Sequence, residues 1–211
     1  MTLICFAVKE EAQFFSRHTK ERPNTEILLT GMGCRNAEKA LRSALALRRF
    51  GIVISSGFAG GLDPGLKRGA VVIDADEGFP LTPNLLGAGA RSVRFYCSDH
   101  VVVTSQEKAQ LWRSTGAHAV EMESRVIRTI CLANATPSAT VRVISDAADE
   151  NLQLDFNQFL TAGFKMNFTK LFRALVRKPS RIGALLRFQK QVRAASRQLA
   201  DTLIQSLDGS G

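Results

Sequence analysis

Apolar runs and amphipathic stretches alternate along most of the chain. Seven runs of five to seven residues have the composition of strands, at 3–8, 26–30, 52–56, 70–75, 100–104, 117–121 and 139–145. Apolar residues at helical spacing predict helices between several of them, at 9–18, 35–50, 106–114 and 123–134. The Gly- and Pro-rich stretch 76–94 predicts a long loop. This alternation is typical of an α/β layered domain with a largely parallel sheet.

The end of the chain has a helical pattern of its own. Apolar residues recur there at steps of three and four, namely Leu185, Phe188, Val192, Ala195, Leu199 and Leu203. We expect Pro179 to separate this helix from an earlier one. Since no repeat or low-complexity linker interrupts the chain, we expect one domain over residues 1–211, with 160–207 as its basic helical segment.

The net charge of +9 comes from this segment. Residues 156–200 contain no Asp or Glu and ten basic side chains, at Lys165, Lys170, Arg173, Arg177, Lys178, Arg181, Arg187, Lys190, Arg193 and Arg197. The rest of the chain, with 18 basic and 19 acidic residues, is nearly neutral. The run is either a solvated helix face or a surface, across 165–197, that docks on an anionic membrane or partner. Nucleic acid fits less well, because no Tyr or Trp is interleaved for base stacking.

The composition restricts the class of protein. Of 211 residues, 45% are hydrophobic and 22% charged, which is the usual mixture for a soluble globular domain. No apolar stretch approaches the roughly 20 residues of a membrane span, and the N-terminus reads as a strand, not as a signal peptide. The cysteines and histidines are scattered, at Cys5, Cys34, Cys97 and Cys131 and at His18, His100 and His118. We therefore expect reduced thiols, a cytoplasmic location and no metal site.

Polar or glycine-rich stretches follow several of the predicted strands. They read "KEEA" at 9–12, "SSGFAGGL" at 55–62, "EMES" at 121–124 and "SDAAD" at 145–149. In layered α/β proteins, ligands bind at the carboxyl ends of the strands. The glycines of the second stretch allow close approach to a ligand, although they also suit an ordinary turn. In "EMES", Glu121 and Glu123 suit either the start of a surface helix or a ligand site, because buried carboxylates need partners.

The stretch "TGMGCRNAEKA" at 30–40 superficially suggests a dinucleotide loop. The third glycine is missing, and no suitable acidic residue follows about 20 residues later. We therefore expect no dinucleotide cofactor.

Four of these motifs, in order, resemble those of a known superfamily. "AVKEEAQFF", "GFAGGLDPGLKRGAVVI", "AVEMES" and "VRVISDAAD" are similar to motifs of the nucleoside phosphorylases and nucleosidases. Within this superfamily, the chain resembles the methylthioadenosine/S-adenosylhomocysteine nucleosidases and the hopanoid-associated phosphorylases that act on adenosylhopane. The resemblance covers roughly residues 1–160. It implies an α/β fold of three α/β/α layers, with a mixed central sheet and, here, basic C-terminal helices.

The resemblance also implies roles for particular residues. Asp146 matches the acid that protonates the leaving purine, with Ser145 beside it, and Glu11 matches the carboxylate that orients or activates water. Glu123 matches the ligand of the ribose hydroxyls, and Met122 packs beneath the sugar. The rest of the matched substrate site comprises Phe58, Ala59, Gly60 and the more structural Glu121, and the candidate anion ligands are Arg35 and Gly33.

The chain departs from the nucleosidases at three places, one of which is the region 76–99, which is shorter here than in that group. Phe58 stands where they have a serine, and "VVVTSQEKAQLW" is a poor match for their base-stacking stretch, in which Trp112 is the candidate here.

We expect an enzyme that cleaves the N-glycosidic bond of a purine nucleoside, a 5′-substituted adenosine above all, without a metal or organic cofactor. The alternatives are phosphorolysis, with inorganic phosphate as co-substrate, and a non-catalytic nucleoside-binding or membrane-associated module. The partners expected are the nucleoside, further copies of the chain and an anionic membrane, which would place the protein in the cytoplasm or at the inner membrane.

Overall fold

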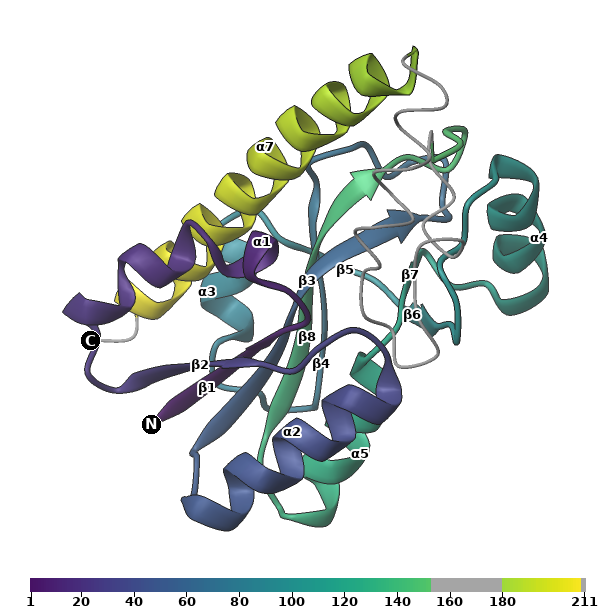
Figure 1. Cartoon of the computed structure of the whole chain (residues 1–211). Helices are drawn as coiled ribbons and strands as arrows, with labels where there is room; N and C mark the ends of the chain where they lie inside the picture. Colours follow the sequence, from purple (N-terminus) through teal and green to yellow (C-terminus); the bar gives the residue numbers. More distant parts are fainter. Residues whose placement is uncertain (153–179, 210–211) are drawn as a thin grey trace.

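An eight-stranded mixed sheet forms the centre of the computed structural model, which describes residues 1–152 and 180–209 (Figure 1). The strands are β1 (Thr2–Phe6), β2 (Thr25–Leu29), β3 (Ile52–Gly61), β4 (Val71–Ala75), β5 (Arg91–Ser92), β6 (Phe95–Cys97), β7 (Ala119–Glu121) and β8 (Ser138–Asp146). The main path runs β2-β1-β3-β8-β4-β5, and β7 pairs with both β3 and β6. Strands β2, β1, β3 and β8 are parallel, whereas β4 is antiparallel to β8 and β7 to β3. The predicted α/β class with a mixed central sheet is confirmed.

Helices cover both faces of this sheet (Figure 1). One face carries α2 (Cys34–Leu47) and α5 (Ser124–Ala133). The other carries α1 (Lys9–Ala12), α3 (Thr82–Gly87) and the long α7 (Ser180–Asp208). Helix α4 (Ser105–Thr115) lies beyond β6 and β7. The three layers are those that the sequence predicts.

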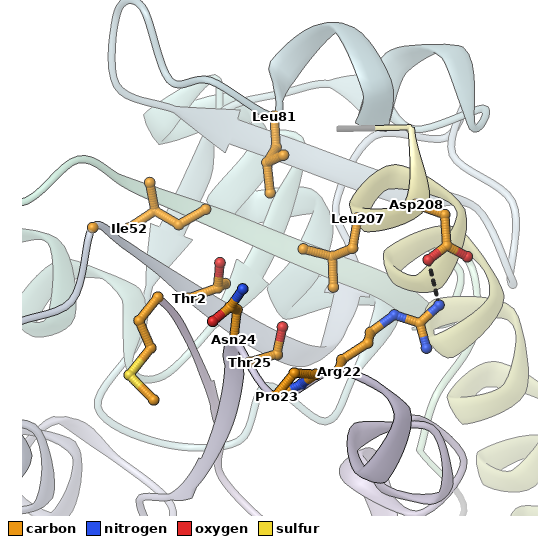
Figure 2. A pocket seen from close by; sticks show the side chains of 11 residues that line it. Thr2, Arg22, Pro23, Asn24, Thr25, Ile52, Leu81, Leu207 and Asp208 are labelled. Carbon is orange, nitrogen blue, oxygen red and sulfur yellow. Dashed lines mark hydrogen bonds and ion pairs between the residues drawn. The ribbon is translucent and has the colours of Figure 1, made fainter. Parts of the chain in front are cut away.

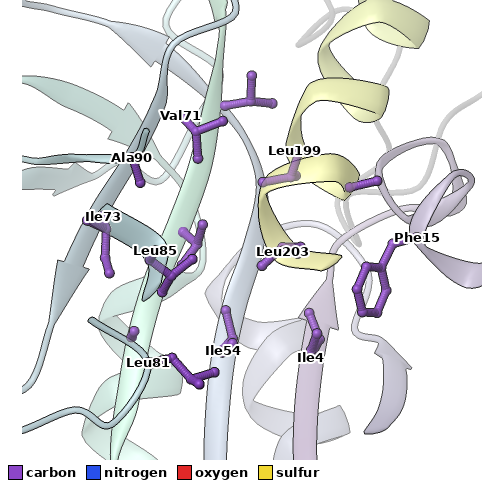
Figure 3. Close-up of a cluster of buried hydrophobic side chains, with 14 of the residues drawn as sticks. Ile4, Phe15, Ile54, Val71, Ile73, Leu81, Leu85, Ala90, Leu199 and Leu203 are labelled. Atoms are coloured by element: carbon purple, nitrogen blue, oxygen red, sulfur yellow. The ribbon is translucent and has the colours of Figure 1, made fainter. Parts of the chain in front are cut away.

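Strand β1 shows why both faces are covered. Leu3 and Cys5 point into the core beneath α2 and α5, whereas Ile4 and Phe6 point into the core beneath α7. This alternation is the two-residue period of a strand. Because both faces are buried, β1 reads in the sequence as one continuous apolar run. Figure 3 shows the second core, in which Leu199 and Leu203 of α7 lie over the strands.

The described part of α7 is amphipathic, as predicted. Ala195, Leu199 and Leu203 are buried against the sheet, whereas Lys190 and Arg193 are exposed. The apolar face of α7 is therefore part of the core. The helix before Pro179, the side chains of Leu185 and Phe188, and the basic side chains from Lys165 to Arg187 lie outside the described residues. The predicted domain limits include that part of the chain and stay a prediction.

Three sequence predictions of local structure differ from the structure. Residues 100–104 form no strand, because the Val103 N–H is bound by the Glu107 carboxylate and Thr104 accepts a hydrogen bond from Glu107 N as the N-cap of α4. The predicted loop 76–94 contains α3 and β5. The helix predicted at 9–18 is shorter, since α1 ends at Ala12 and a 3₁₀ turn (Phe15–Arg17) follows.

All four cysteines are free thiols, with Cys5 and Cys131 buried and Cys34 and Cys97 half-buried. Within the described residues, none of the helices combines the length and apolar character needed to cross a bilayer.

Candidate active site

A single arginine organises the carboxyl edge of the sheet. Arg142 lies in β8 and is only 1% exposed. Its Nη2 donates to Glu121 Oε2 at 2.7 Å and to Glu123 Oε2 at 3.2 Å. Its Nη1 donates to the Ser56 carbonyl at 3.1 Å. Because a buried cation needs such partners, Arg142 fixes where both carboxylates lie. The sequence analysis did not select it, although one arginine inside the apolar run "VRVIS" was a signal.

Glu11 is held between α1 and β3. Its Oε2 accepts hydrogen bonds from Ala7 N at 2.8 Å and Val8 N at 3.1 Å, and its Oε1 accepts one from Phe58 N at 2.9 Å. Burial raises the pKa of Glu11, while the charge of Arg142 opposes that rise. Phe58 therefore contributes a backbone N–H here, and its ring packs against the core beneath α7.

Gly57 makes this approach of Glu11 to β3 possible. Its φ is +145°, a conformation that L side chains rarely adopt. A Cβ at this position would overlap Glu11 Oε1 and Arg142 Nη1. In the sequence "SGF", Phe58 therefore supplies the backbone N–H donor, and Gly57 leaves the space that the side chains of Glu11 and Arg142 occupy.

The two acidic residues of "EMES" have different tasks. Glu121 accepts from Glu123 N at 2.9 Å, Ser124 N at 2.7 Å and Ser124 Oγ at 2.7 Å, so its carboxylate satisfies the first N–H groups of α5. Glu123 instead turns its Oε1 to the Gly33 N–H, at 2.8 Å. Both carboxylate oxygens of Glu121 accept hydrogen bonds from within the protein, whereas Glu123 links the loop before α2 to Arg142.

The acidity of Glu123 is strongly perturbed. Its pKa is raised from 4.5 to about 7, because burial and the nearby charges of Glu121 and Glu11 raise it more than Arg142 lowers it. The carboxylates of Glu11, Glu121 and Glu123 therefore all interact electrostatically with Arg142. Such coupling of buried acids is typical of catalytic sites and also of structural ion-pair networks.

Asp146 ends β8, farther along the same strand, opposite Gly60 of β3. Its Oδ1 lies 2.6 Å from Ser145 Oγ, and its Oδ2 lies 2.5 Å from Lys108 Nζ. Ser145 Oγ also lies 3.2 Å from the Ala59 carbonyl. The sequence analysis missed Lys108, because a lysine on an amphipathic helix is usually a surface residue.

The structure separates the two candidate anion ligands. The Gly33 N–H is bound to the Glu123 carboxylate, so the anion at this position is part of the protein. The role of Gly33 and Arg35 as anion ligands stays a prediction. Arg35 is exposed in the first turn of α2. Of the other predicted residues, Met122 and Ala59 are buried, and Trp112 is 39% exposed on α4.

The motifs around this edge match one family model. The model for the Phosphorylase superfamily matches residues 5–77 and 84–177. The chain belongs to this superfamily.

Individual superfamily members are similar over most of the chain. A 5′-methylthioadenosine/S-adenosylhomocysteine nucleosidase from Lysinibacillus sphaericus is 25% identical over 197 residues, 76% of this chain and 85% of the relative. The nucleosidase of that name from Psychromonas ingrahamii is 26% identical over 176 residues, 66% of this chain and 76% of the relative. The solved nucleosidase from Neisseria meningitidis, in complex with methylthio-immucillin-A, has a TM-score of 0.71 at 20% identity, covering 99% of this chain and 98% of that one. Futalosine hydrolase of Helicobacter pylori has a TM-score of 0.70 at 16% identity, covering 99% and 97%. The solved structures confirm the fold.

A hollow of about 500 Å³ lies at the opposite edge of the sheet of this superfamily member (Figure 2). It is lined by the first residues of β1, β2 and β3 and by the Arg22–Asp208 ion pair. None of the site residues above lines it. Among the described residues, no group of three or more His, Cys, Asp or Glu side chains is arranged to hold a metal ion.

Proposed function

We propose that the protein cleaves the N-glycosidic bond of a purine nucleoside, namely a 5′-substituted adenosine, and releases adenine. One observation carries the proposal: Glu11, Glu123 and Asp146, which lie within the ranges that the superfamily model matches, are all buried near the carboxyl ends of the strands. Nucleosidases that are 25% and 26% identical to the chain support the substrate class.

The roles proposed for these residues follow from the chemistry of the bond. Asp146 gives its proton to the purine as the C1′–N9 bond breaks, because a neutral base leaves more easily than an anion. Glu123 binds the ribose hydroxyls, and its charge stabilises the positive charge that develops on the sugar. Glu11 orients the water that attacks C1′ and takes its proton. The pKa of Glu11, raised by burial, makes its carboxylate a stronger base for this step.

We propose water, not phosphate, as the nucleophile. A phosphate dianion needs a clamp of arginines, lysines or clustered N–H groups. Here Arg142 is committed to two carboxylates, and the Gly33 N–H is bound to Glu123. The carboxylates of Glu11, Glu121 and Glu123 would repel a dianion, which leaves the exposed Arg35 as the alternative ligand. Phosphate-dependent cleavage is the competing activity.

We further propose that the basic C-terminal segment binds an anionic membrane by electrostatics alone. The apolar side of α7 is buried, whereas Lys190, Arg193 and Arg197 line an outer hollow of about 600 Å³ together with Phe14. Each basic residue near an anionic bilayer contributes about 1 kcal/mol. Such a location suits a lipid-linked adenosyl substrate, as in the hopanoid-associated enzymes that the chain resembles.

Vesicle co-sedimentation at low salt tests this location. We expect binding to anionic vesicles, none to neutral ones, and a clear loss when Arg187, Lys190, Arg193 and Arg197 are changed to Gln. Equal binding to both vesicle types would contradict this proposal and indicate that the segment is an ordinary solvated helix face.

We also propose that the protein forms a homo-oligomer. Leu47 and Leu132 are 85% and 79% exposed near the ends of α2 and α5, which offers an apolar surface to a second copy. Sedimentation of the parent and of a Leu47→Gln/Leu132→Gln variant tests this, and a monomeric parent contradicts it.

A chromatographic assay for free adenine tests the function. The parent and Asp146→Asn are incubated with a panel of 5′-modified adenosines, with and without inorganic phosphate. We expect adenine from the parent without phosphate and at least about a hundredfold less from the variant. Nucleoside binding without cleavage would instead identify a non-catalytic nucleoside-binding module.

A further inference from the structure

Lys108 is a fully buried lysine that uses all three of its donors. It lies in α4 and is 0% exposed. Its Nζ donates to Asp146 Oδ2 at 2.5 Å, to the Ala147 carbonyl at 2.7 Å and to the Glu150 carbonyl at 2.9 Å. Buried lysines are rare unless they are paired, so the Asp146 carboxylate is the partner that makes this burial tolerable.

The ion pair fixes the orientation of the Asp146 carboxylate. Lys108 holds Oδ2 and Ser145 Oγ lies against Oδ1, so both oxygens are engaged from opposite sides. Gly60 leaves room for this arrangement, since a Cβ there would lie 3.3 Å from Asp146 Oδ2 and 3.8 Å from Lys108 Cε. Rotation of the carboxylate would break at least one of these contacts.

Helix α4 is anchored so that Lys108 points inward. The Thr104 side chain accepts the Glu107 N–H at the start of the helix, and the Lys108 N–H donates to the Thr104 carbonyl. Leu111, one turn farther on, packs against the apolar cluster around Leu62. Lys108 therefore reaches Asp146 from a rigid element.

The turn after β8 has supports other than Lys108. Glu150 accepts the Ala147 N–H at 2.8 Å and pairs with Arg68 at 2.6 Å. Lys108 also binds two carbonyls of this turn, but these other supports do not supply the positive charge that it brings to Asp146.

We propose that Lys108 is the positioning residue of Asp146. The ammonium holds the carboxylate in the orientation that faces the purine, and it balances the negative charge left on Asp146 when the proton moves to the base. Asp146 takes up a proton from solvent before the step; its O–H bond then breaks as the N–H bond forms on the purine, while Lys108 keeps its own protons. This assignment rests on the proposed role of Asp146, and it goes beyond the motifs of the sequence.

A double-mutant cycle with Lys108→Met and Asp146→Asn tests the assignment. We expect Lys108→Met to lower kcat for adenine release about 30-fold or more, with KM within about threefold, because a misplaced catalytic group costs up to about a hundredfold. The exposed lysine variant Lys39→Met is the matched control and stays within about twofold of the parent.

The double variant distinguishes positioning from structural support. If Lys108 acts through Asp146, adding Lys108→Met to Asp146→Asn lowers kcat by less than about threefold. A further loss of more than about tenfold overturns the proposal. The comparison also serves if Lys108→Met alone does not fold, because the double variant leaves no buried carboxylate unpaired.

Adenine binding separates this proposal from the proposed function. In calorimetry with adenine alone, we expect each single variant to bind about tenfold more weakly than the parent and the double variant no more weakly than that. If the parent binds adenine but cleaves no nucleoside, the proposed function is wrong, and the adenine affinities of the variants still test the role of Lys108. Additive losses of adenine affinity overturn the role of Lys108.

Discussion

The Phe58 N–H donates to Glu11 Oε1 at 2.9 Å across 47 residues of sequence. This bond joins α1 to β3 and places a buried carboxylate beside β3. Arg142 provides the opposite charge from β8, so residues of three strands and their loops form one network. The predictions below test the parts of this network separately.

We predict that Glu11→Gln and Asp146→Asn each lower kcat by at least about a hundredfold, because general acids and bases contribute about 10²–10⁴. Both substitutions preserve shape, so circular dichroism should show a folded chain. Asp146→Asn also removes the partner of the buried Lys108, so its melting temperature should fall below that of the parent. The exposed neighbours provide controls, and Glu10→Gln and Asp149→Asn should keep near-parent turnover. Near-normal turnover of Glu11→Gln or Asp146→Asn would remove that residue from the mechanism.

We predict that Arg142→Met lowers the free energy of unfolding by about 3–5 kcal/mol, because it leaves buried carboxylates without a counterion. Urea denaturation measures this loss. The control is Arg68→Gln, since Arg68 pairs with Glu150 at a partly exposed site and should cost less than about 1 kcal/mol. Similar losses for the two variants would contradict the central place of Arg142.

We predict that Gly57→Ala is far more destabilising than Gly69→Ala. Both glycines have positive φ, but a Cβ at Gly57 meets Glu11 and Arg142, whereas a Cβ at Gly69 meets nothing within 4 Å. Overpacking typically costs about 1–3 kcal/mol in addition to backbone strain. Thermal denaturation of both variants gives the comparison, and equal melting temperatures would show that the overlap is relieved at no cost.

We predict that stability falls as the pH rises from about 5 to 8, in part because of Glu123. Its pKa rises from 4.5 to about 7 on folding, so the folded chain binds more protons than the unfolded chain between these values. Stability therefore decreases through this range and levels off above about pH 7. In Glu123→Gln, the free energy of unfolding should decrease less between pH 5 and 8 than in the parent, by on the order of 2 kcal/mol. Urea midpoints at pH 5, 6, 7 and 8 measure it, and parallel curves for parent and variant would contradict the assignment.

The sequence predicts the layers well because the central strands β1, β3 and β8 are largely buried on both faces and contain apolar runs. It fails at 100–104, where three valines look like a strand but the Glu107 carboxylate takes the Val103 N–H. The pattern of apolar residues does not show that a side chain will take a backbone N–H that a strand would need for pairing.

The sequence also identifies the acidic residues better than their counterions. Glu11, Glu123 and Asp146 stand in short polar motifs that follow predicted strands, and Glu123 and Asp146 each have a serine beside them. Arg142 and Lys108 stand inside a strand and a helix, where their partners come from distant parts of the chain. Only the tertiary structure shows that these two cations are buried.

Isotope labelling of the sugar product tests the central claim most directly. The parent is incubated in H₂¹⁸O with inorganic phosphate and a 5′-substituted adenosine, and both products are identified by mass spectrometry. The account predicts adenine and a free ribose derivative with one ¹⁸O at C1′. A sugar 1-phosphate would contradict water as the nucleophile, and the absence of adenine with every adenosine tested would contradict N-glycosidic cleavage itself.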